Sequence, residues 1–281
     1  GILTFDKENP KGYGRIKRIE DEVVEIVEDK DCSEVEKKIK EINTGIMCID
    51  TSRLIQWLSK ITNNNSQKEY YLTDIVDLAK KDRIKIETYK AKDESTISGI
   101  NSKNELITME KMMKEKKNAE LIAQGVVIID SSRTEIRGSL TCGSDVEIDV
   151  GCIFEGDVKL GNNVKVGAYT HIKQSTILDD TTIKPYSHID TSEVGQKNNI
   201  GPYARLRPGA KTKNNVNIGN FVEIKNSEIG SGTKINHLSY VGDSEVGENV
   251  NIGAGCITCN YDGLNKHKTI IEDDVFMGSN S

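Results

Sequence analysis

The 281-residue sequence has no apolar run that approaches the roughly 18 residues needed for a membrane-spanning helix. It also lacks the pattern of a secretory signal peptide at its start. Hydrophobic residues make up 36% of the chain and charged residues 29%, a balance that is typical of a soluble globular protein. We therefore expect a cytoplasmic protein with no membrane partner.

An excess of basic residues is absent as well. The formal net charge of −6 points away from a nucleic-acid partner, because nucleic-acid-binding proteins carry basic patches or stripes. This balance still allows a local basic site for a phosphorylated small molecule.

The six cysteines lack the repeated spacing of a metal site. Cys256 and Cys259 form a single C-x-x-C pair, and a zinc site would need a second pair of ligands. We interpret the cysteines as reduced thiols that pack as small apolar side chains.

The first hundred residues mix strand and helix patterns. Residues 41–50 predict a strand, and Leu54, Trp57 and Leu58 follow at helical spacing. Thr73 is the predicted N-cap of a second helix. Alternation of this kind favours the α/β class.

A single connecting helix is predicted over residues 102–125. Ser102 and Glu105 form a capping box at its start, and Gly125 stands where a C′ glycine belongs. We therefore divide the chain into 1–101, the linker helix 102–125, and 126–281.

Residues 126–281 contain a repeat in which one aliphatic or similar residue recurs every six positions, with some steps of five. Three such steps close one triangular coil of seventeen or eighteen residues, so the repeat predicts a β-solenoid with these side chains stacked inside. The repeated positions are Ile148, Phe154, Leu160, Val166, Ile172, Ile177, Ile183, Ile189, Val194, Ile200, Leu206, Thr212, Ile218, Ile224, Ile229, Ile235, Val241, Val246 and Ile252.

The coil register places two cations one above the other. Leu206 and Ile224 are eighteen residues apart, and Arg207 and Lys225 directly follow them. Strands in neighbouring coils are about 4.8 Å apart, so the like charges oppose one another unless an anion bridges them. Either a bound phosphate lies between the two cations or they splay apart into solvent.

The same register places Glu223 beneath Tyr240 and near His237. A carboxylate near an imidazole fixes its tautomer and raises its basicity. The repeat is interrupted after Ile257 by an insertion headed by Asn260 and Tyr261, which is either a plain loop or part of a site. We interpret the other three histidines, His171, His188 and His267, as solvated or without a special role.

Several segments of the repeat resemble one bacterial enzyme family. "GPYARLRPGA", "IGNFVEIKNS", "INHLSYVGD" and "VNIGAGCITCNYDG" are similar to the acetyltransferase domain of the bifunctional N-acetylglucosamine-1-phosphate uridyltransferase / glucosamine-1-phosphate N-acetyltransferase family. "NPKGYGRI", "EINTGI" and "SGINSKNEL" are similar to the later part of its uridyltransferase domain. The resemblance covers essentially the whole chain in the same order.

This resemblance implies a fold and a reaction pair. The fold is a partial α/β nucleotidyltransferase-type (Rossmann-like) domain, a connecting helix, and a left-handed parallel β-helix of hexapeptide repeats. The enzyme transfers an acetyl group from acetyl-CoA to glucosamine 1-phosphate, then a uridyl group from UTP to the product, releasing pyrophosphate. The family also implies a homotrimer with each acetyltransferase site built from neighbouring chains.

The resemblance assigns roles to residues of the solenoid. His237 is the general base and Glu223 supports it. The sugar phosphate is bound by Arg207, Lys225, Tyr240 and Asn251, and acetyl-CoA by Ala254, Asn260, Tyr261 and Ser279.

In the front domain, the resemblance assigns nucleotide-sugar contacts to Gly14, Glu28, Asn43 and Asn101. Asn101 is also the implied ligand of Mg²⁺, a hard cation that prefers oxygen. Without the family, the glycine suits a turn, the glutamate a solvated surface and the asparagines strand ends.

The first residue is Gly and the last residues are "VFMGSNS", which we interpret as a fragment cut at both ends. The family's glycine-rich triphosphate loop, a Mg²⁺-binding aspartate and the final coils are expected outside it, so we expect the fragment itself to be impaired in both reactions. Two alternatives remain open. One is another fusion of a sugar-phosphate nucleotidyltransferase and an acyltransferase. The other is a non-catalytic solenoid that only organises a trimer.

Overall fold

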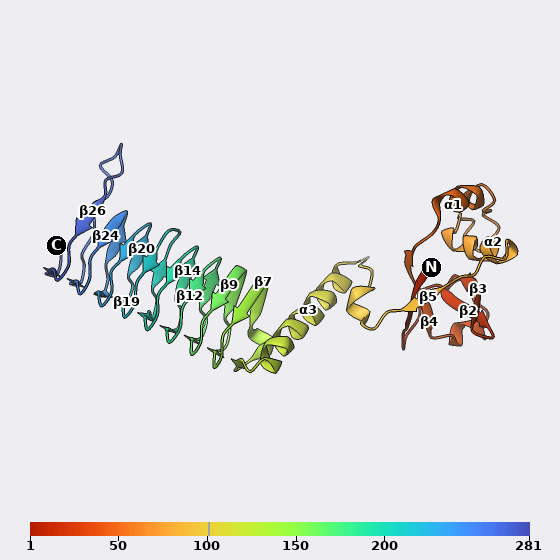
Figure 1. Cartoon of the computed structure of the whole chain (residues 1–281), viewed down its shortest axis with the longest axis horizontal. Helices are drawn as coiled ribbons and strands as arrows, with labels where there is room; N and C mark the ends of the chain where they lie inside the picture. Colours follow the sequence, from red (N-terminus) through yellow and green to blue (C-terminus); the bar gives the residue numbers. More distant parts are fainter. Residues whose placement is uncertain (101) are drawn as a thin grey trace. The chain divides into compact units, whose positions relative to one another are not determined.

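The computed structural model describes residues 1–100 and 102–281 (Figure 1). It forms two compact units, Gly1–Met109 and Glu110–Ser281, and the division falls inside helix α3 (Lys103–Ala123). Among the described helices, none is long and apolar enough to cross a membrane. The domain limits proposed at 101 and 125 stay a prediction.

The first unit is an α/β unit built on one five-stranded mixed sheet, in agreement with the predicted class. The strand order is β3-β2-β4-β1-β5, with antiparallel pairing throughout except between β1 and β5. The strands are β1 (Ile2–Asp6), β2 (Arg15–Ile19), β3 (Glu22–Val27), β4 (Glu41–Met47) and β5 (Thr88–Lys90), and the helices are α1 (Thr51–Leu58) and α2 (Ile75–Lys81).

One predicted helix cap in this unit is wrong. Thr73 lies in a 3-10 turn, Leu72–Asp74, that precedes α2, and it caps no helix. Its hydroxyl instead donates to Oε1 of Glu28 at 2.9 Å. Thr73 is buried, so this carboxylate satisfies a hydroxyl that water does not reach freely.

Both predicted ends of helix α3 are confirmed. The backbone N–H of Ser102 donates to the Glu105 carboxylate at 3.0 Å, and the N–H of Glu105 donates to the Ser102 hydroxyl at 3.2 Å. Gly125 has a φ of +95°, and the N–H of Val126 reaches back to the carbonyl of Leu121 at 3.1 Å. This is a Schellman-type ending, for which glycine suits the left-handed position.

The second unit is the predicted solenoid, a stack of coils in which each strand pairs in parallel with strands of the coils above and below (Figure 1). One nine-stranded sheet forms the first face. A thirteen-stranded sheet divides after β9 into two series, which form the other two faces. The prediction that three repeat steps close one triangular coil is therefore confirmed.

The strands of the first face are β6 (Val127–Ile128), β8 (Glu147–Ile148), β10 (Lys165–Val166), β13 (Thr182–Ile183), β16 (Asn199–Ile200), β19 (Asn217–Asn220), β22 (Lys234–His237), β25 (Asn251–Ile252) and β27 (Phe276–Met277). The long strands β7 (Glu135–Cys142) and β9 (Ile153–Leu160) span both other faces. They are followed on the second face by β11 (His171–Lys173), β14 (His188–Asp190), β17 (Arg205–Leu206), β20 (Glu223–Lys225) and β23 (Tyr240–Gly242). The third face contains β12 (Thr176–Ile177), β15 (Glu193–Val194), β18 (Lys211–Thr212), β21 (Glu228–Ile229), β24 (Ser244–Val246) and β26 (Thr269–Ile271).

All nineteen repeat positions named above are buried, with exposed fractions of 5% or less. The register is the expected one, since Leu206 pairs with Ile224, Ile224 with Val241, and Ile218 with Ile235. Full burial of one such side chain is worth about 1.5–3 kcal/mol, so the internal ladders dominate the stability of the stack.

Most corners of the solenoid turn through a residue with a positive φ. Asparagine, aspartate and glycine occupy many of these positions, as their tolerance of the left-handed region predicts. One corner differs, because it carries aromatic residues at φ values of +56° to +61°. We define Tyr169, Tyr186, Tyr203 and Phe221 as the aromatic ladder; their rings stack with centroids 5.0–5.3 Å apart.

Candidate functional site

One edge of the nine-stranded sheet gathers three of the predicted site residues. The register of β22, β25 and β27 pairs their core aliphatic residues in order. The residues two positions after these core residues in the chain are His237, Ala254 and Ser279. Neighbouring coils lie about 4.8 Å apart, so the predicted base stands in one column with two predicted acetyl-CoA residues.

The imidazole of His237 is exposed and has a neutral partner. Its Nδ1 lies 3.0 Å from Oδ1 of Asn220, which is also its register partner in β19. The N–H of Leu238 donates to the backbone carbonyl of Asn220 at 3.1 Å, which fixes the two strand ends against each other. The sequence interpretation placed a carboxylate beside this imidazole, and the structure places Asn220 there.

Glu223 lies under Tyr240, as the register predicted. Its carboxylate accepts a hydrogen bond from Nη1 of Arg207 at 2.8 Å, and Nη1 of Arg205 lies 3.6 Å from its other oxygen. The two arginines thus engage the carboxylate that was expected to support His237. The supporting role of Glu223 stays a prediction.

Lys225 stacks one coil beyond Arg207, because the preceding core residues pair, but it has a carboxylate of its own. Its Nζ lies 3.3 Å from Oδ2 of Asp243, so the cation pair is partly neutralised within the chain. Asp243 also accepts hydrogen bonds from Asn226, at 2.7 Å, and from Asn260. The bond from Asn226 is the main cause that lowers the pKa of Asp243 below its usual range, with Asn260 and Lys225 adding to it.

Asp243 therefore joins two groups of predicted site residues. Lys225 belongs to the predicted phosphate site, whereas Asn260 belongs to the predicted acetyl-CoA site. The phenol oxygen of Tyr240 lies 3.5 Å from Nδ2 of the same Asn260. Asp243 thus connects Asn260, at the start of the insertion, to Lys225 on the second face.

The predicted residues occupy two faces of the solenoid. His237 and Asn251 lie on the nine-stranded sheet, whereas Arg207, Lys225 and the residues around them lie on the second face. Between the faces stands the corner residue Leu238, which is 61% exposed. Within one chain the two groups of side chains are separated by this corner.

The insertion stands away from the stack of coils near its C-terminal end (Figure 1). Its first part is held in place, since Asn260 is buried, but Tyr261 is exposed. His267 is exposed as expected, and its Nε2 lies 2.7 Å from a carboxylate oxygen of Asp262. The backbone N–H of Asn265 and this imidazole lower the pKa of Asp262 to about 2.

Three predicted nucleotide-sugar residues of the first unit lie together. The carbonyl of Gly14 accepts the backbone N–H of Asn43 at 2.8 Å. A Cβ built on Gly14 would lie 2.9 Å from a methyl carbon of Ile26 and 3.4 Å from both carboxylate oxygens of Glu28. A side chain at this position would force Ile26 to shift and would lie against the Glu28 carboxylate.

Asn101, the fourth of these residues and the predicted Mg²⁺ ligand, lies outside the described residues. Within residues 1–100 and 102–281, no three His, Cys, Asp or Glu side chains are grouped so that they could hold a metal ion. Glu28 and Asn43 carry the oxygen donors that Mg²⁺ prefers, but they do not form a ligand set by themselves. Cys256 and Cys259 do not form such a group either. The thiol of Cys256 is buried, whereas that of Cys259 is exposed.

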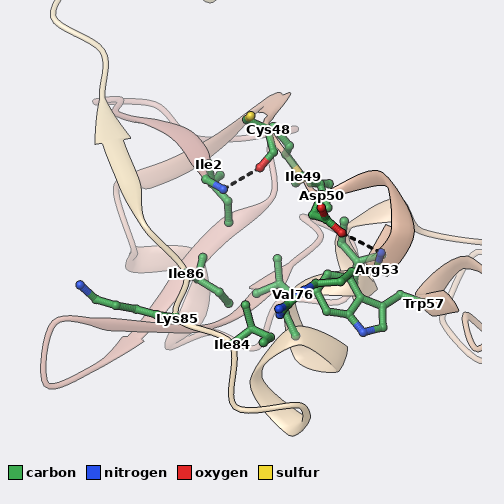
Figure 2. Close-up of a pocket in the computed structure, with 14 residues that line it drawn as sticks. Ile2, Cys48, Ile49, Asp50, Arg53, Trp57, Val76, Ile84, Lys85 and Ile86 are labelled. Carbon is green, nitrogen blue, oxygen red and sulfur yellow. Dashed lines mark hydrogen bonds between the residues drawn. The ribbon is translucent and has the colours of Figure 1, made fainter. Parts of the chain in front are cut away.

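The first unit also contains a cavity of about 380 Å³ (Figure 2). Apolar side chains such as Met47, Trp57, Val76 and Ile86 line it, and Arg53 is among the few charged ones. None of the described residues assigned to a predicted site lies in its wall. The indole Nε1 of Trp57, one of the lining residues, donates a hydrogen bond to the carboxylate of Asp82 at 2.7 Å.

The sequence interpretation missed Asn220, Asp243 and the aromatic ladder. Asn220 lies seventeen residues before His237 and Asp243 seventeen after Asn226, so the coil register contained a signal for both. The ladder residues follow the same steps of seventeen or eighteen. Applying the period to exposed positions as well as to the core would have found all of them.

The whole chain matches three curated proteins named "Bifunctional protein GlmU". It is 52% identical to that of Nitrosospira multiformis over 283 residues, 52% to that of Methylobacillus flagellatus over 280, and 53% to that of Marinomonas sp. over 281. Each alignment takes in 100% of this chain. The chain belongs to the GlmU family.

The chain spans 61–62% of the length of these GlmU relatives. A family model described as the GMPPB C-terminal domain also matches residues 136–210, which lie within the solenoid.

Solved structures give weaker likenesses than the GlmU relatives do. The UDP-N-acetylglucosamine acyltransferase of Francisella novicida is 17% identical, with 47% of this chain and 58% of that chain covered and a TM-score of 0.33. The N-acyltransferase AntD of Bacillus cereus is 20% identical, with 48% and 78% covered and a TM-score of 0.21. At these TM-scores neither likeness bears on the fold or the function.

Proposed function

We propose that the protein to which this chain belongs makes UDP-N-acetylglucosamine in two steps. It transfers an acetyl group from acetyl-CoA to the amine of glucosamine 1-phosphate, and then a uridyl group from UTP to N-acetylglucosamine 1-phosphate, releasing pyrophosphate. The observation that carries this proposal is the match of the whole chain, at 52% identity, to proteins named as bifunctional GlmU. The column of His237, Ala254 and Ser279 supports the acetyl-transfer half.

In the acetyl transfer, the neutral amine attacks the thioester carbon of acetyl-CoA. His237 takes the proton that the amine loses, the tetrahedral intermediate collapses, and CoA leaves as its thiol or thiolate. A base on an exposed strand end beside the acetyl-CoA residues is suitably placed for this proton transfer. Products are N-acetylglucosamine 1-phosphate and CoA.

Arg207 and Lys225 position the sugar by its phosphate. A guanidinium has five N–H donors, so Arg207 can keep its bond to Glu223 and still donate to a phosphate oxygen. Fixing the phosphate holds the amine against the thioester, which lowers the entropic part of the barrier. Tyr240 and Asn251 complete the sugar contacts, and Asn260 and Tyr261 line the acetyl-CoA side.

In the uridyl transfer, Gly14, Glu28 and Asn43 hold the nucleotide sugar. The closeness of these three residues in the first unit supports the assignment. Asn101 would join them and ligate Mg²⁺, which supplies charge neutralisation at the phosphates when bound. UTP is the second substrate, and we place the enzyme in the cytoplasm without a nucleic-acid or membrane partner.

We further propose a homotrimer in which neighbouring chains complete the acetyl-transfer site. The two groups of site residues lie on faces that diverge from the corner at Leu238, so one small substrate contacts both more easily if another chain packs along that corner. The aromatic ladder runs along this corner and ends at Leu238. The ladder rings stack on one another but stay 43–56% exposed, which leaves an apolar strip that another chain can cover.

Truncating the ladder tests the trimer. We expect Tyr203→Ser with Phe221→Ser, made in the full-length protein, to shift its sedimentation from trimer toward monomer at micromolar concentration. The matched control is Leu178→Ser, which removes an apolar side chain that is 43% exposed at another corner. A trimer unchanged by the double substitution, at native thermal stability, would exclude this corner as the interface.

The proposed reactions are tested on the full-length protein with purified substrates. We expect CoA release that depends on both acetyl-CoA and glucosamine 1-phosphate, and pyrophosphate release that depends on UTP and N-acetylglucosamine 1-phosphate. Turnover of a different amino sugar phosphate in preference to glucosamine 1-phosphate would point to another nucleotidyltransferase/acyltransferase fusion. Failure to bind either acetyl-transfer substrate would favour a non-catalytic solenoid.

A further inference from the structure

The partner of the proposed base is the amide of Asn220. Register places Asn220 and His237 side by side in β19 and β22, and Oδ1 of the amide lies 3.0 Å from Nδ1 of the imidazole. The backbone of Leu238 donates to the carbonyl of the same asparagine at 3.1 Å. The side-chain contact is therefore built on a backbone pairing that limits how far either residue can move.

An amide oxygen is only an acceptor, so this contact favours the tautomer with the proton on Nδ1. Nε2 then carries the lone pair, which is the atom that accepts a proton from an amine. The other tautomer would put a lone pair on Nδ1 against the lone pairs of Oδ1. The geometry thus separates the two ring nitrogens into one that is held and one that reacts.

Among the residues next to His237 in the register, Asn220 is the one whose side chain contacts Nδ1. On the side of the next coil stands Ala254, which has no polar side chain. Lys234 precedes His237 by three residues in β22, and Asn217 pairs with Lys234 in β19. The nearest carboxylate expected from sequence, Glu223, is hydrogen-bonded to Arg207 across the corner.

We propose that Asn220 is a positioning residue for acetyl transfer, which orients His237 and selects its reactive tautomer without placing a negative charge beside the ring. This proposal rests on the proposed acetyltransferase function. A neutral acceptor and a carboxylate differ in a measurable way, because a carboxylate favours the charged imidazolium. Under this proposal, Glu223 interacts with Arg207 on the second face, and the side chain at position 220 sets the orientation and basicity of the imidazole.

The test compares Asn220→Ala with Asn220→Asp in the full-length protein. We expect Asn220→Ala to lower the kcat of acetyl transfer on the order of tenfold, since one hydrogen bond of about 1–1.5 kcal/mol no longer holds the ring. The KM values for glucosamine 1-phosphate and acetyl-CoA should change less than about twofold. We expect Asn220→Asp to recover much of kcat while moving the acidic limb of the pH–rate profile upward by about one unit or more.

Two further variants make the outcome specific. Asn199→Ala removes an asparagine side chain one coil before β19 on the same sheet, and it should leave kcat and the pH profile unchanged. Glu223→Gln should leave the acidic limb in place, because the carboxylate contacts arginine and not the ring.

The proposal is overturned if Asn220→Ala retains native kcat, or if Glu223→Gln moves the acidic limb and Asn220→Asp does not. Loss of folding in Asn220→Ala is detected by thermal unfolding, and Asn220→Asp then decides the question. A wild-type protein without acetyl transfer would overturn the proposed function itself. Normal wild-type turnover with an inactive His237→Ala and a native Asn220→Ala would overturn only the role of Asn220.

Discussion

Replacing His237 with alanine is expected to lower the kcat of acetyl transfer to glucosamine 1-phosphate by about 10²- to 10⁴-fold. That range is the usual contribution of a general base to a proton transfer in the transition state. His237 is exposed on a strand end and contributes nothing to the core, so the fold and both KM values should stay close to native. Uridyl transfer by the same protein should be unchanged, because its proposed residues lie in the first unit.

The pH dependence of this variant separates a base from a binding residue. The residual rate of His237→Ala should rise with pH through the range where the free amine of the substrate becomes populated, since no protein group then takes the proton. His171→Gln is the matched control, because His171 occupies the second face three coils before Glu223. Native kcat in His237→Ala would remove this histidine from the mechanism.

Replacing Arg207 with alanine is expected to raise the KM for glucosamine 1-phosphate by about 10- to 100-fold. A hydrogen bond to a charged group is worth about 1.5–3 kcal/mol, which corresponds to this range. The KM for acetyl-CoA should stay native. Arg207→Lys should restore only part of the affinity, since an ammonium lacks the planar fork that holds both Glu223 and a phosphate.

A substrate without the phosphate makes this prediction specific. With glucosamine in place of glucosamine 1-phosphate, Arg207→Ala and the wild type should show the same low kcat/KM, because the interacting group is absent in both cases. Lys173→Ala is the matched control, since Lys173 occupies the same column two coils earlier and pairs with Glu155 at 2.8 Å. An equal loss of activity toward both substrates would show that Arg207 acts through the structure and not through the phosphate.

The sequence predicted the backbone of the solenoid better than its side-chain partners. Leu206 and Ile224 had to pair because a shift of register would remove whole ladders of aliphatic residues from the core. The partner of Glu223 was not determined in this way. Arg207 and His237 were both about one coil away, and surface contacts of this kind differ by about 1 kcal/mol or less, so spacing alone does not select between them.

Sequence patterns for helix caps also predicted contacts between near neighbours but not contacts between distant residues. The capping box of Ser102 and Glu105 was predictable because both groups lie within one turn of the same helix. Thr73 resembled a cap in sequence, but its hydroxyl donates to the carboxylate of Glu28, which directly follows β3. A hydroxyl that contacts a residue 45 positions away cannot be assigned from its neighbours in the chain.

Because the coils pair in a linear order, the number of coils sets how far a residue lies along the solenoid axis. Each strand of the nine-stranded sheet pairs only with its immediate neighbours along the described order, and β8 to β16 contribute none of the proposed site residues. Loss or duplication of one seventeen-residue coil in that stretch would preserve every ladder and move the site by about 4.8 Å along the axis. Evolution can therefore adjust how far the proposed acetyl-transfer site stands from the connecting helix in discrete steps, without altering a residue of that site.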